Sequence, residues 1–254
     1  MNPFRREPVS VVEPAPRPPA RPRLLLASAS PSRAALLRAA GVEPLVQPAD
    51  VDEDAVLARH TAAHGPASVA ETVQLLATAK AEAVAAQLWP AGADPSEMPP
   101  PTAAGTGLRP ETAAVDIPAR VVLGCDSLLE VDGAALGKPH TPDRARERWR
   151  HIRGRSGVLH TGHQLISSTD RAAGTSSTTV YFAEISDTEI EAYVATGEPL
   201  EVAGAFTIEG YGSAFITGIE GDHHGVLGLS LPLLRNLLPA VGLSWTDLWQ
   251  PPAR

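Results

Sequence analysis

Residues 24–33 read Leu24-Leu25-Leu26-Ala27-Ser28-Ala29-Ser30-Pro31-Ser32-Arg33, an apolar run followed at once by small and polar side chains. The apolar part, residues 24–27, is typical of a buried strand. Ser30 and Pro31 supply an N-cap and a proline at the first helical position, which predicts a helix that runs to Ala40. Gly41 follows, where a left-handed C-cap is wanted. The stretch therefore predicts a strand that turns directly into a helix.

The turn between this strand and this helix is a candidate binding site for phosphate. A tight turn leaves free backbone N–H groups at the start of the helix, and these groups attract anions. The side chains that would add donors and charge are Ser28, Ser30, Ser32 and Arg33. Taken alone, such a segment is more often a well-capped helix with a surface arginine.

Proline marks two stretches of the chain that cannot bury an apolar face. Many of the 25 prolines fall within residues 1–22 and 90–118, and in the second stretch Ala, Gly and Thr fill most of the remainder. We expect a disordered tail at 1–22 and a Pro/Ala/Gly-rich insert at 90–118. With 254 residues, 43% of them apolar, the chain can build one large α/β domain or two small ones.

Charge and cysteine content narrow the possible partners. A net charge of −8 argues against broad binding to nucleic acid or to an anionic membrane, because both need a basic surface. Cys125 is the only cysteine, so neither an intramolecular disulfide nor a cysteine metal site can form. No run approaches the roughly 18 apolar residues of a membrane span. We expect a cytoplasmic protein that does not bind membranes.

Helix and strand signals continue along the chain. Ser68 and Glu71 form a capping box, which predicts a long Ala-rich helix to about Leu88. The acidic residues 50–54 before it read as a loop. The other elements that we expect are strands at 120–124 and 128–131, a hairpin turn at Asp132-Gly133, a helix from Thr141 to Gly154, antiparallel strands at 158–167 and 176–185, a helix from Ser186 to Gly197, and a last helix at 231–238.

The tripeptide Cys125-Asp126-Ser127 is a polar step between two apolar strand segments. A carboxylate is costly there unless it binds something, such as a metal or a water awaiting activation. An aspartate that caps a turn at the end of a strand is an equally good reading.

Three more charged side chains could join such a site. Lys138 stands between glycine and proline after the hairpin, in a rigid setting that suits a phosphate contact. Lys80 lies within the Ala-rich helix, and Glu53 could bind a divalent cation together with Asp126. Each of the three is more often simply solvated.

The histidines do not predict a metal site. His160 and His163 are three residues apart on an expected strand, so their side chains should face opposite ways. His223 and His224 are adjacent in a glycine-rich loop, and the sequence suggests no third ligand for them. The chain also lacks a glycine-rich loop ending in Lys-Ser/Thr, which argues against a P-loop NTPase.

Nine short motifs, in order, resemble those of the Maf family across nearly all of residues 24–238. They are Ser-Ala-Ser-Pro-Ser-Arg at 28–33, Asp52-Glu53, Lys80-Ala81, Cys125-Asp126-Ser127, Leu136–Pro139, Thr161-Gly162, Glu198-Pro199, Ala203-Gly204 and Glu220-Gly221. The resemblance implies one domain at 23–250 with an α/β fold like that of the inosine triphosphate pyrophosphatases. Helices would flank its mixed β-sheet, and two lobes would surround a cleft.

The resemblance also implies an activity and a set of roles. It implies a nucleoside triphosphate pyrophosphatase that releases pyrophosphate, with Asp126 as its catalytic acidic residue. Asp126 and Glu53 would hold Mg²⁺ or Mn²⁺, and a homodimer is expected by analogy only. The residues that would bind substrate are Ser28, Ser30, Ser32, Arg33, Lys80, Ser127, Lys138 and Glu209.

Some positions depart from the family patterns. Ser32 stands where an arginine is frequent. Ser127 matches neither the subgroup that resembles dTTP/UTP enzymes nor the one that resembles 7-methyl-GTP enzymes, whereas Glu209 agrees with the second, so the preferred base stays open. Two other functions also remain open. One is a nucleotide-binding regulator of septum formation without catalysis, and the other is a nucleotidyltransferase, which would need an acceptor.

Overall fold

The strand-to-helix unit expected at residues 24–33 is present as β1 (Arg23–Leu26) and α1 (Pro31–Ala39) in the computed structural model, which describes residues 23–89 and 120–250. Pro31 opens α1 behind the N-cap Ser30, as expected. The predicted tail at 1–22 and the predicted insert at 90–118 lie outside the described residues.

The sheet is mixed and has seven strands, in the order β2-β1-β3-β5-β6-β7, with β4 beside β3. β1 pairs in parallel with β2 and β3, and the other pairs are antiparallel. The strands not yet bounded are β2 (Leu45–Val46), β3 (Arg120–Val131), β4 (Ala134–Leu136), β5 (Ser156–Ile166), β6 (Arg171–Phe182) and β7 (Ile216–Glu220). The expected α/β fold with a mixed sheet is confirmed.

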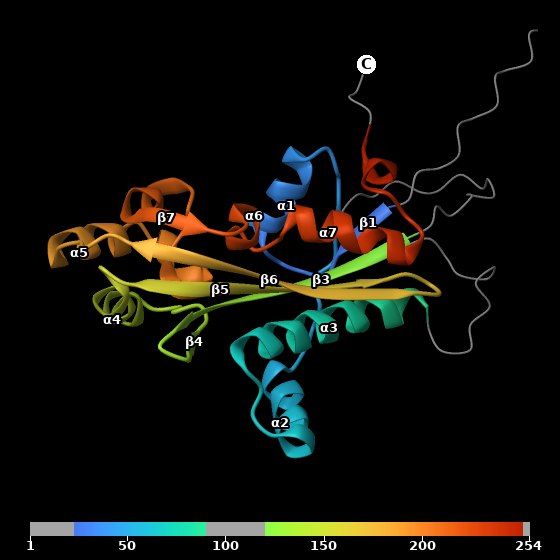
Figure 1. The fold of residues 1–254 in the computed structure, drawn as a ribbon, viewed down its shortest axis with the longest axis horizontal. Helices are drawn as coiled ribbons and strands as arrows, with labels where there is room; N and C mark the ends of the chain where they lie inside the picture. Colours follow the sequence, from blue (N-terminus) through green and yellow to red (C-terminus); the bar gives the residue numbers. More distant parts are fainter. Residues whose placement is uncertain (1–22, 90–119, 251–254) are drawn as a thin grey trace, which may run out of the picture.

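Helices cover both faces of the sheet. In Figure 1, α1, α6 and α7 lie above the long strands and α3 lies below them. α4 and α5 lie at the end of the sheet where β5 begins and β6 ends. The remaining bounds are α2 (Glu53–His64), α3 (Val69–Leu88), α4 (Pro142–Ile152), α5 (Asp187–Ala195), α6 (His223–Val226) and α7 (Leu231–Leu237). Short 3-10 helices occupy much of residues 198–215 and 238–248.

The buried residues form three clusters, two of them near α1, α3 and α7 and one at the opposite end of the long strands. Near α1, α3 and α7 the core is aliphatic and includes Leu26, Leu37 and Val84. At the other end it is aromatic. There the fully buried Trp149 meets Phe182 and Tyr193 edge to face, at centroid distances of 5.9 and 5.5 Å. Edge-to-face contacts between aromatic rings stabilise the core beyond what the burial of their apolar surface contributes.

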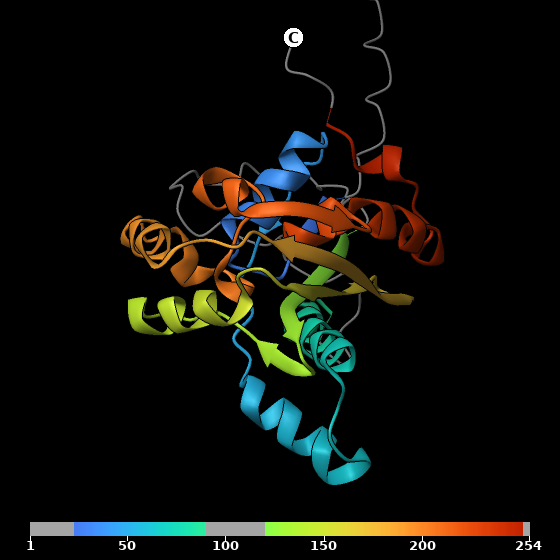
Figure 2. The same cartoon turned by 60° about the vertical axis from the view of Figure 1, so that its left-hand side comes forward.

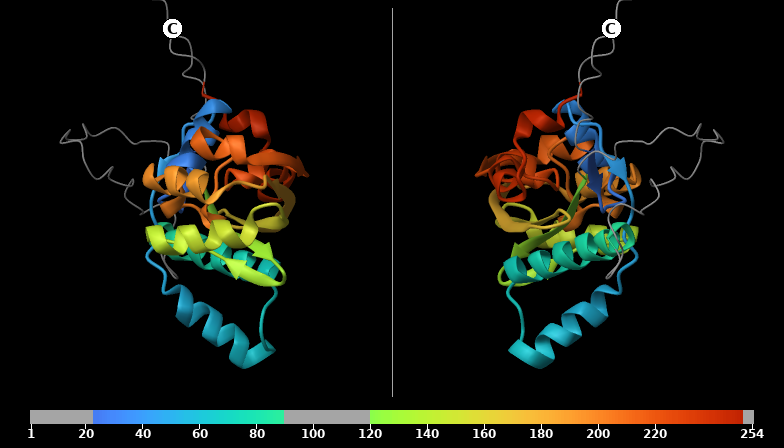
Figure 3. Two further views of the ribbon diagram at one scale, coloured as in Figure 1. Left: turned by 90° about the vertical axis from the view of Figure 1, so that its left-hand side faces the viewer. Right: turned by 90° about the vertical axis from the view of Figure 1, so that its right-hand side faces the viewer.

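Local signals identified most elements, with differences at four of them. β6 begins at Arg171 rather than at Ser176, and His223–Val226, read as part of a loop, form α6. β3 is one continuous strand, since the polar step at Cys125–Ser127 stays in register with β5. The acidic segment read as a loop opens α2, whose first residue is Glu53. Asp52 caps that helix, but α2 buries none of its residues, so no apolar stripe announced it. Figures 2 and 3 show α2 projecting beyond α3, away from the sheet.

Within residues 23–89 and 120–250 we find no helix whose length and hydropathy would carry it through a lipid bilayer.

His160 and His163 point to opposite faces of β5, as their spacing predicts. His160 contacts Ser177 and Glu130 on one face. On the other face the fully buried His163 accepts the Ser230 N–H through Nε2 (2.8 Å) and donates from Nδ1 to the Thr161 carbonyl (3.0 Å). Because Nε2 must accept, protonation of this ring would break the bond to Ser230, at the start of α7.

We expect His163 to make stability fall with acid. Burial and the nearby Arg33 charge lower the pKa of His163 from 6.5 to about 4. Between pH 6.5 and about 4, His163 is protonated in the unfolded chain but neutral in the folded chain. The free energy of unfolding therefore falls as pH falls. The loss reaches about 3 kcal/mol at pH 4.

Urea unfolding across this pH range measures the effect. In His163→Gln the free energy of unfolding should depend less steeply on pH than in the wild type. In His64→Gln, at an exposed position, it should keep the wild-type dependence. Equal slopes in the wild type and His163→Gln would contradict the assignment.

Candidate active site

One cleft of about 850 Å³ collects every side chain that the sequence singled out for binding or catalysis. It opens where the β1–α1 turn, the start of α2, the middle of β3 and the segments at 201–209 and 226–228 meet. Its predicted members are Ser28, Ser30, Ser32, Arg33, Glu53, Lys80, Asp126, Ser127, Lys138 and Glu209. Segments far apart in the sequence are thus brought to one place.

Arg33 is buried and braces the wall of the cleft. Its Nε donates to the Gly228 carbonyl (2.7 Å), Nη1 to Ser28 Oγ and the Cys125 carbonyl (2.9 Å each), and Nη2 to Ser127 Oγ (3.0 Å). These bonds use every N–H of the guanidinium except one on Nη2. Arg33 therefore fixes three segments in place and has one N–H left for a ligand.

Ser127 continues this network across the sheet. Thr161 Oγ1 donates to the Gly225 carbonyl (2.8 Å), so the 2.9 Å bond between the Ser127 and Thr161 hydroxyls must have Ser127 as its donor. Ser127 then accepts from Arg33. Ser127 and Arg33 form their hydrogen bonds with other segments of the chain, and these bonds stabilise the shape of the cleft.

Asp126, Lys80 and Glu53 form the charged centre of the cleft. Lys80 Nζ lies 2.5 Å from Asp126 Oδ1 and 2.8 Å from Glu53 Oε1. The Asp126 and Lys80 side chains are 14% and 16% exposed, whereas Glu53 is 48% exposed. Two carboxylates from different elements therefore converge on one positive charge. The contact between Asp126 and Lys80 is largely shielded from water.

Two glycines bring α3 close enough for this contact. A Cβ at Gly124 would lie 2.2 Å from the Ala77 carbonyl oxygen, and one at Gly162 would lie 2.4 Å from that of Val73. Only glycine permits α3 to pack so closely on β3 and β5. Gly124 and Asp126 share a face of β3. This close approach therefore sets Lys80 against Asp126.

Burial also sets the acidity of two neighbouring groups. Desolvation raises the pKa of the Asp126 carboxyl above its ordinary value, although Lys80 and Arg33 favour its charged form. Desolvation raises the pKa of the fully buried Cys125 thiol to about 12. Asp126 is thus a strengthened proton acceptor, and Cys125 is a core residue without nucleophilic character.

The remaining predicted residues offer polar groups to the open side of the cleft. Ser30 makes no side-chain cap to α1 and lines the cleft, so its hydroxyl is not engaged by the helix, and the amides of the first helical turn lack partners within the helix. Lys138 is 53% exposed and lies 3.9 Å from Glu201, the loosest of the ion pairs in the cleft. Ser32 is half-buried, and Glu209 is exposed at the rim.

Glu198 is an organising residue that the sequence marked only as part of a motif. Its carboxylate accepts from the Thr207 hydroxyl (2.6 Å), the Tyr193 hydroxyl (3.0 Å) and the amides of Tyr211 and Gly212 (2.9 Å each). Four donors on one carboxylate fix the segment that carries Glu209 into the cleft. In the sequence, only the neighbouring Gly197 and Pro199 indicate a constrained turn at this position.

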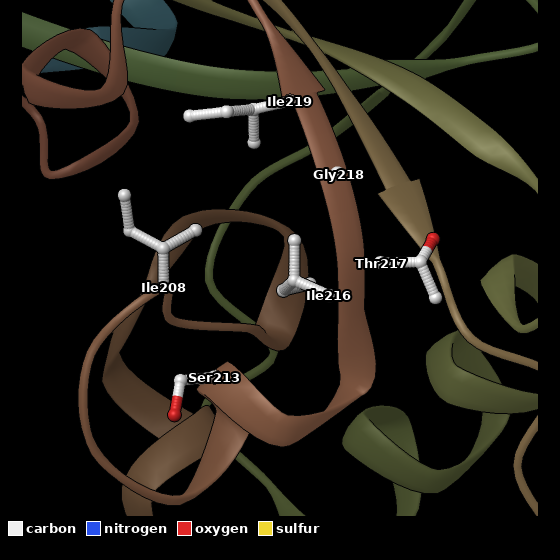
Figure 4. Close-up of a pocket in the computed structure, with 6 residues that line it drawn as sticks. All are labelled: Ile208, Ser213, Ile216, Thr217, Gly218 and Ile219. Carbon is white, nitrogen blue, oxygen red and sulfur yellow. The ribbon is translucent and has the colours of Figure 1, made fainter.

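A second, shallower pocket of about 290 Å³ lies beside β7 (Figure 4). Its lining is Ile208, Ser213, Ile216, Thr217, Gly218 and Ile219. Without a titratable side chain among these residues, it offers nothing to balance the charge of a phosphate. The larger cleft is therefore the candidate active site.

The chain is similar to known proteins of one family. A family model described as "Maf-like protein" matches residues 23–241. A protein of Leifsonia xyli named "Nucleoside triphosphate pyrophosphatase" is 49% identical over 89% of this chain and 96% of its own length. Proteins of the same name from Saccharopolyspora erythraea (47% identical, 91% of this chain, 98% of their length) and Mycobacterium ulcerans (46%, 89% and 96%) are similar as well.

Proposed function

Because the chain belongs to the Maf family, we propose that it is a nucleoside triphosphate pyrophosphatase that hydrolyses the bond between the α and β phosphates. The products are a nucleoside monophosphate and pyrophosphate. One observation carries this conclusion, namely the largely buried Asp126 that faces Lys80 and Glu53 within the cleft. The names of the similar proteins support the enzymatic function and do not support a purely regulatory one.

The triphosphate is expected to lie against the start of α1. There the amides of the first turn and the Ser30 hydroxyl can donate to phosphate oxygens, with the N-terminal end of the helix dipole behind them. The remaining N–H of Arg33 and the loosely paired Lys138 add positive charge. Lys80 can turn from its carboxylates to the leaving pyrophosphate as negative charge grows there.

Asp126 is proposed as the general base. Its raised pKa makes it a better proton acceptor than an ordinary aspartate, and its cleft-facing position allows it to take a proton from water that attacks the α phosphorus. Such a direct displacement needs no covalent intermediate. Arg33 and Ser127 act as positioning residues, because their bonds hold the neighbouring backbone in place.

The donor set fits a divalent cation such as Mg²⁺ or Mn²⁺. Asp126 and Glu53 present oxygens that already converge on one positive charge, and hard cations prefer oxygen ligands. The carboxylates that line the cleft (Glu53, Asp126, Glu201, Glu209) outnumber its lysine and arginine side chains (Arg33, Lys80, Lys138). A triphosphate thus needs further positive charge, and the cation, when bound, would screen phosphate oxygens and acidify water.

Further aspects of the proposal rest on composition and family analogy. The net charge of −8 supports a small nucleotide rather than a nucleic acid as the anionic partner. A single cysteine supports the reducing cytoplasm as the location. A homodimer is proposed by analogy alone, and the preferred base remains to be identified by screening.

The direct test is a screen of canonical and modified triphosphates with Mg²⁺ or Mn²⁺, in which products are identified. Monophosphate with pyrophosphate is the expected pair, and diphosphate with orthophosphate would overturn the bond assignment. Water must be the only acceptor present, because a nucleotidyltransferase would then form no monophosphate. A regulator that only binds would return the triphosphate intact.

A further inference from the structure

A second group of potential metal ligands lies at the turn between β7 and α6. Asp222, His223 and His224 each offer a ligand atom there, and these atoms all lie within 4.8 Å of one another. The two imidazole rings are stacked at a tilt, with centroids 3.7 Å apart. The sequence had left the two histidines without a third ligand, and in the structure the carboxylate of the preceding Asp222 lies beside them.

One pair of donor atoms has the spacing found around a tetrahedral ion. His224 Nδ1 lies 3.2 Å from Asp222 Oδ1. A zinc ion with Zn–N and Zn–O bonds of about 2.0–2.2 Å at the tetrahedral angle separates two of its ligands by about 3.3 Å. This pair is therefore already spaced as two ligands of one ion. His223 is exposed and can turn its ring toward the same point.

The backbone around the three residues is held firmly before any ion binds. The Asp222 carboxylate accepts the amide N–H groups of His224 (3.1 Å) and Gly225 (3.2 Å). Thr178 Oγ1 accepts the Asp222 N–H and donates to the Asp222 carbonyl, both at 3.0 Å. Asp222 and the backbone of His224 are fixed in this way, so little of their conformational entropy is lost when an ion binds, and the His223 side chain is the ligand that has to be ordered.

We propose that Asp222, His223 and His224 form a binding site for a divalent transition metal of the Zn²⁺ class, with water as its fourth ligand. Imidazole favours Zn²⁺, Cu²⁺ and Ni²⁺, whereas Mg²⁺ keeps oxygen ligands. The site therefore differs in chemistry from the pair Glu53 and Asp126, and it does not depend on the proposed hydrolysis.

The position of this site gives the ion a structural effect on the cleft. The Gly225 carbonyl accepts from Thr161, and the Gly228 carbonyl accepts from Arg33. Residues 226–228 line the cleft itself. An ion on residues 222–224 would fasten the segment that holds Arg33, and it would stabilise the folded chain because the unfolded chain presents no such site.

Calorimetric titration of the whole protein with Zn²⁺, in excess Mg²⁺, tests the proposal. One Zn²⁺ per chain should bind, and Co²⁺ in its place should give the strong visible absorption of a tetrahedral site. At a Zn²⁺ concentration about 100 times Kd, Tm should rise by about 5 °C or more. Absence of Zn²⁺ binding to the wild-type protein would overturn the proposal.

Paired variants locate the ion. The double variant His223→Asn/His224→Asn should weaken Zn²⁺ binding by at least about a hundredfold. The matched control is His60→Asn/His64→Asn, which removes the other close histidine pair, with ring centroids 5.0 Å apart on α2. This control should bind Zn²⁺ as the wild type does. Loss of binding in the control, or unchanged binding in the first variant, would contradict the assignment.

A single substitution covers the case in which the double variant fails to fold. His223 is exposed, so His223→Asn should leave the Tm without metal unchanged. It should still weaken Zn²⁺ binding by about tenfold or more. Equal affinity in wild type and His223→Asn would remove His223 from the site and overturn the three-ligand proposal.

Discussion

Asp126→Asn should lower kcat by at least about a hundredfold while the protein keeps its fold. Asparagine has nearly the same shape, and its amide oxygen can still accept from Lys80, which lies 2.5 Å from the aspartate in the wild type. What disappears is the negative charge and the ability to take a proton from water. The rate of pyrophosphate release measures the loss, and the Tm of the variant shows whether the fold is kept.

The matched control for this substitution is Glu201→Gln. Glu201 also lines the cleft, but its side chain is exposed. It lies 3.9 Å from Lys138, so the ion pair between the two is weak. Its neutralisation should change kcat by less than about tenfold. If Asp126→Asn kept near wild-type turnover, or if both variants lost activity equally, Asp126 could not be the general base.

The same carboxylate should also shape the pH dependence of the reaction. A general base works only when ionised, so kcat/KM should fall as pH falls through the pKa of Asp126 in the free enzyme. Because burial raises that pKa, the fall should begin at a higher pH than an ordinary aspartate would produce. A profile that stayed flat down to the ordinary aspartate range would contradict this expectation.

Gly124→Ala should destabilise the protein by roughly 3 kcal/mol or more. The added Cβ would meet the backbone of α3, at 2.2 Å from the Ala77 oxygen and 2.7 Å from the Ala81 nitrogen, and a backbone cannot rotate out of the way as a side chain can. α3 would have to move away from the sheet and take Lys80 with it. Urea unfolding measures the stability, and kcat should fall as well.

Gly218→Ala is the control for this effect. Gly218 also lies within a strand, β7, but a Cβ there would meet only Tyr181, at an ordinary 3.7 Å. Its substitution should change the free energy of unfolding by less than about 0.5 kcal/mol. Similar losses from the two substitutions would mean that close packing of α3 is not what Gly124 provides.

Motif order predicted the residues that line the cleft more fully than local patterns could. The Asp126, Lys80 and Glu53 side chains come from three separate elements, and single-residue reasoning gave each a more ordinary explanation. Their joint occurrence in a known order placed them together, and all of them line the cleft. Capping boxes were equally informative for the fold, because Ser68 and Ser186 act through contacts three residues away.

What the sequence could not reveal depends on long-range contacts. The spacing of residues 28–33 does not show that the Arg33 Nε–H donates to the Gly228 carbonyl, so it could not predict that Arg33 also braces the wall of the cleft. Helix α2 was missed because it buries no apolar face. The close approach at Gly124 and the four donors on Glu198 likewise appear only once distant segments meet.

Hydrolysis in water enriched in ¹⁸O tests the central claim most directly, because it records which phosphorus the water attacks. Asp126 is proposed to direct water to the α phosphorus, so the label should appear in the nucleoside monophosphate and be absent from the pyrophosphate. Label found in pyrophosphate or in orthophosphate would show attack at the β or γ phosphorus, and the proposed reaction in this cleft would be wrong.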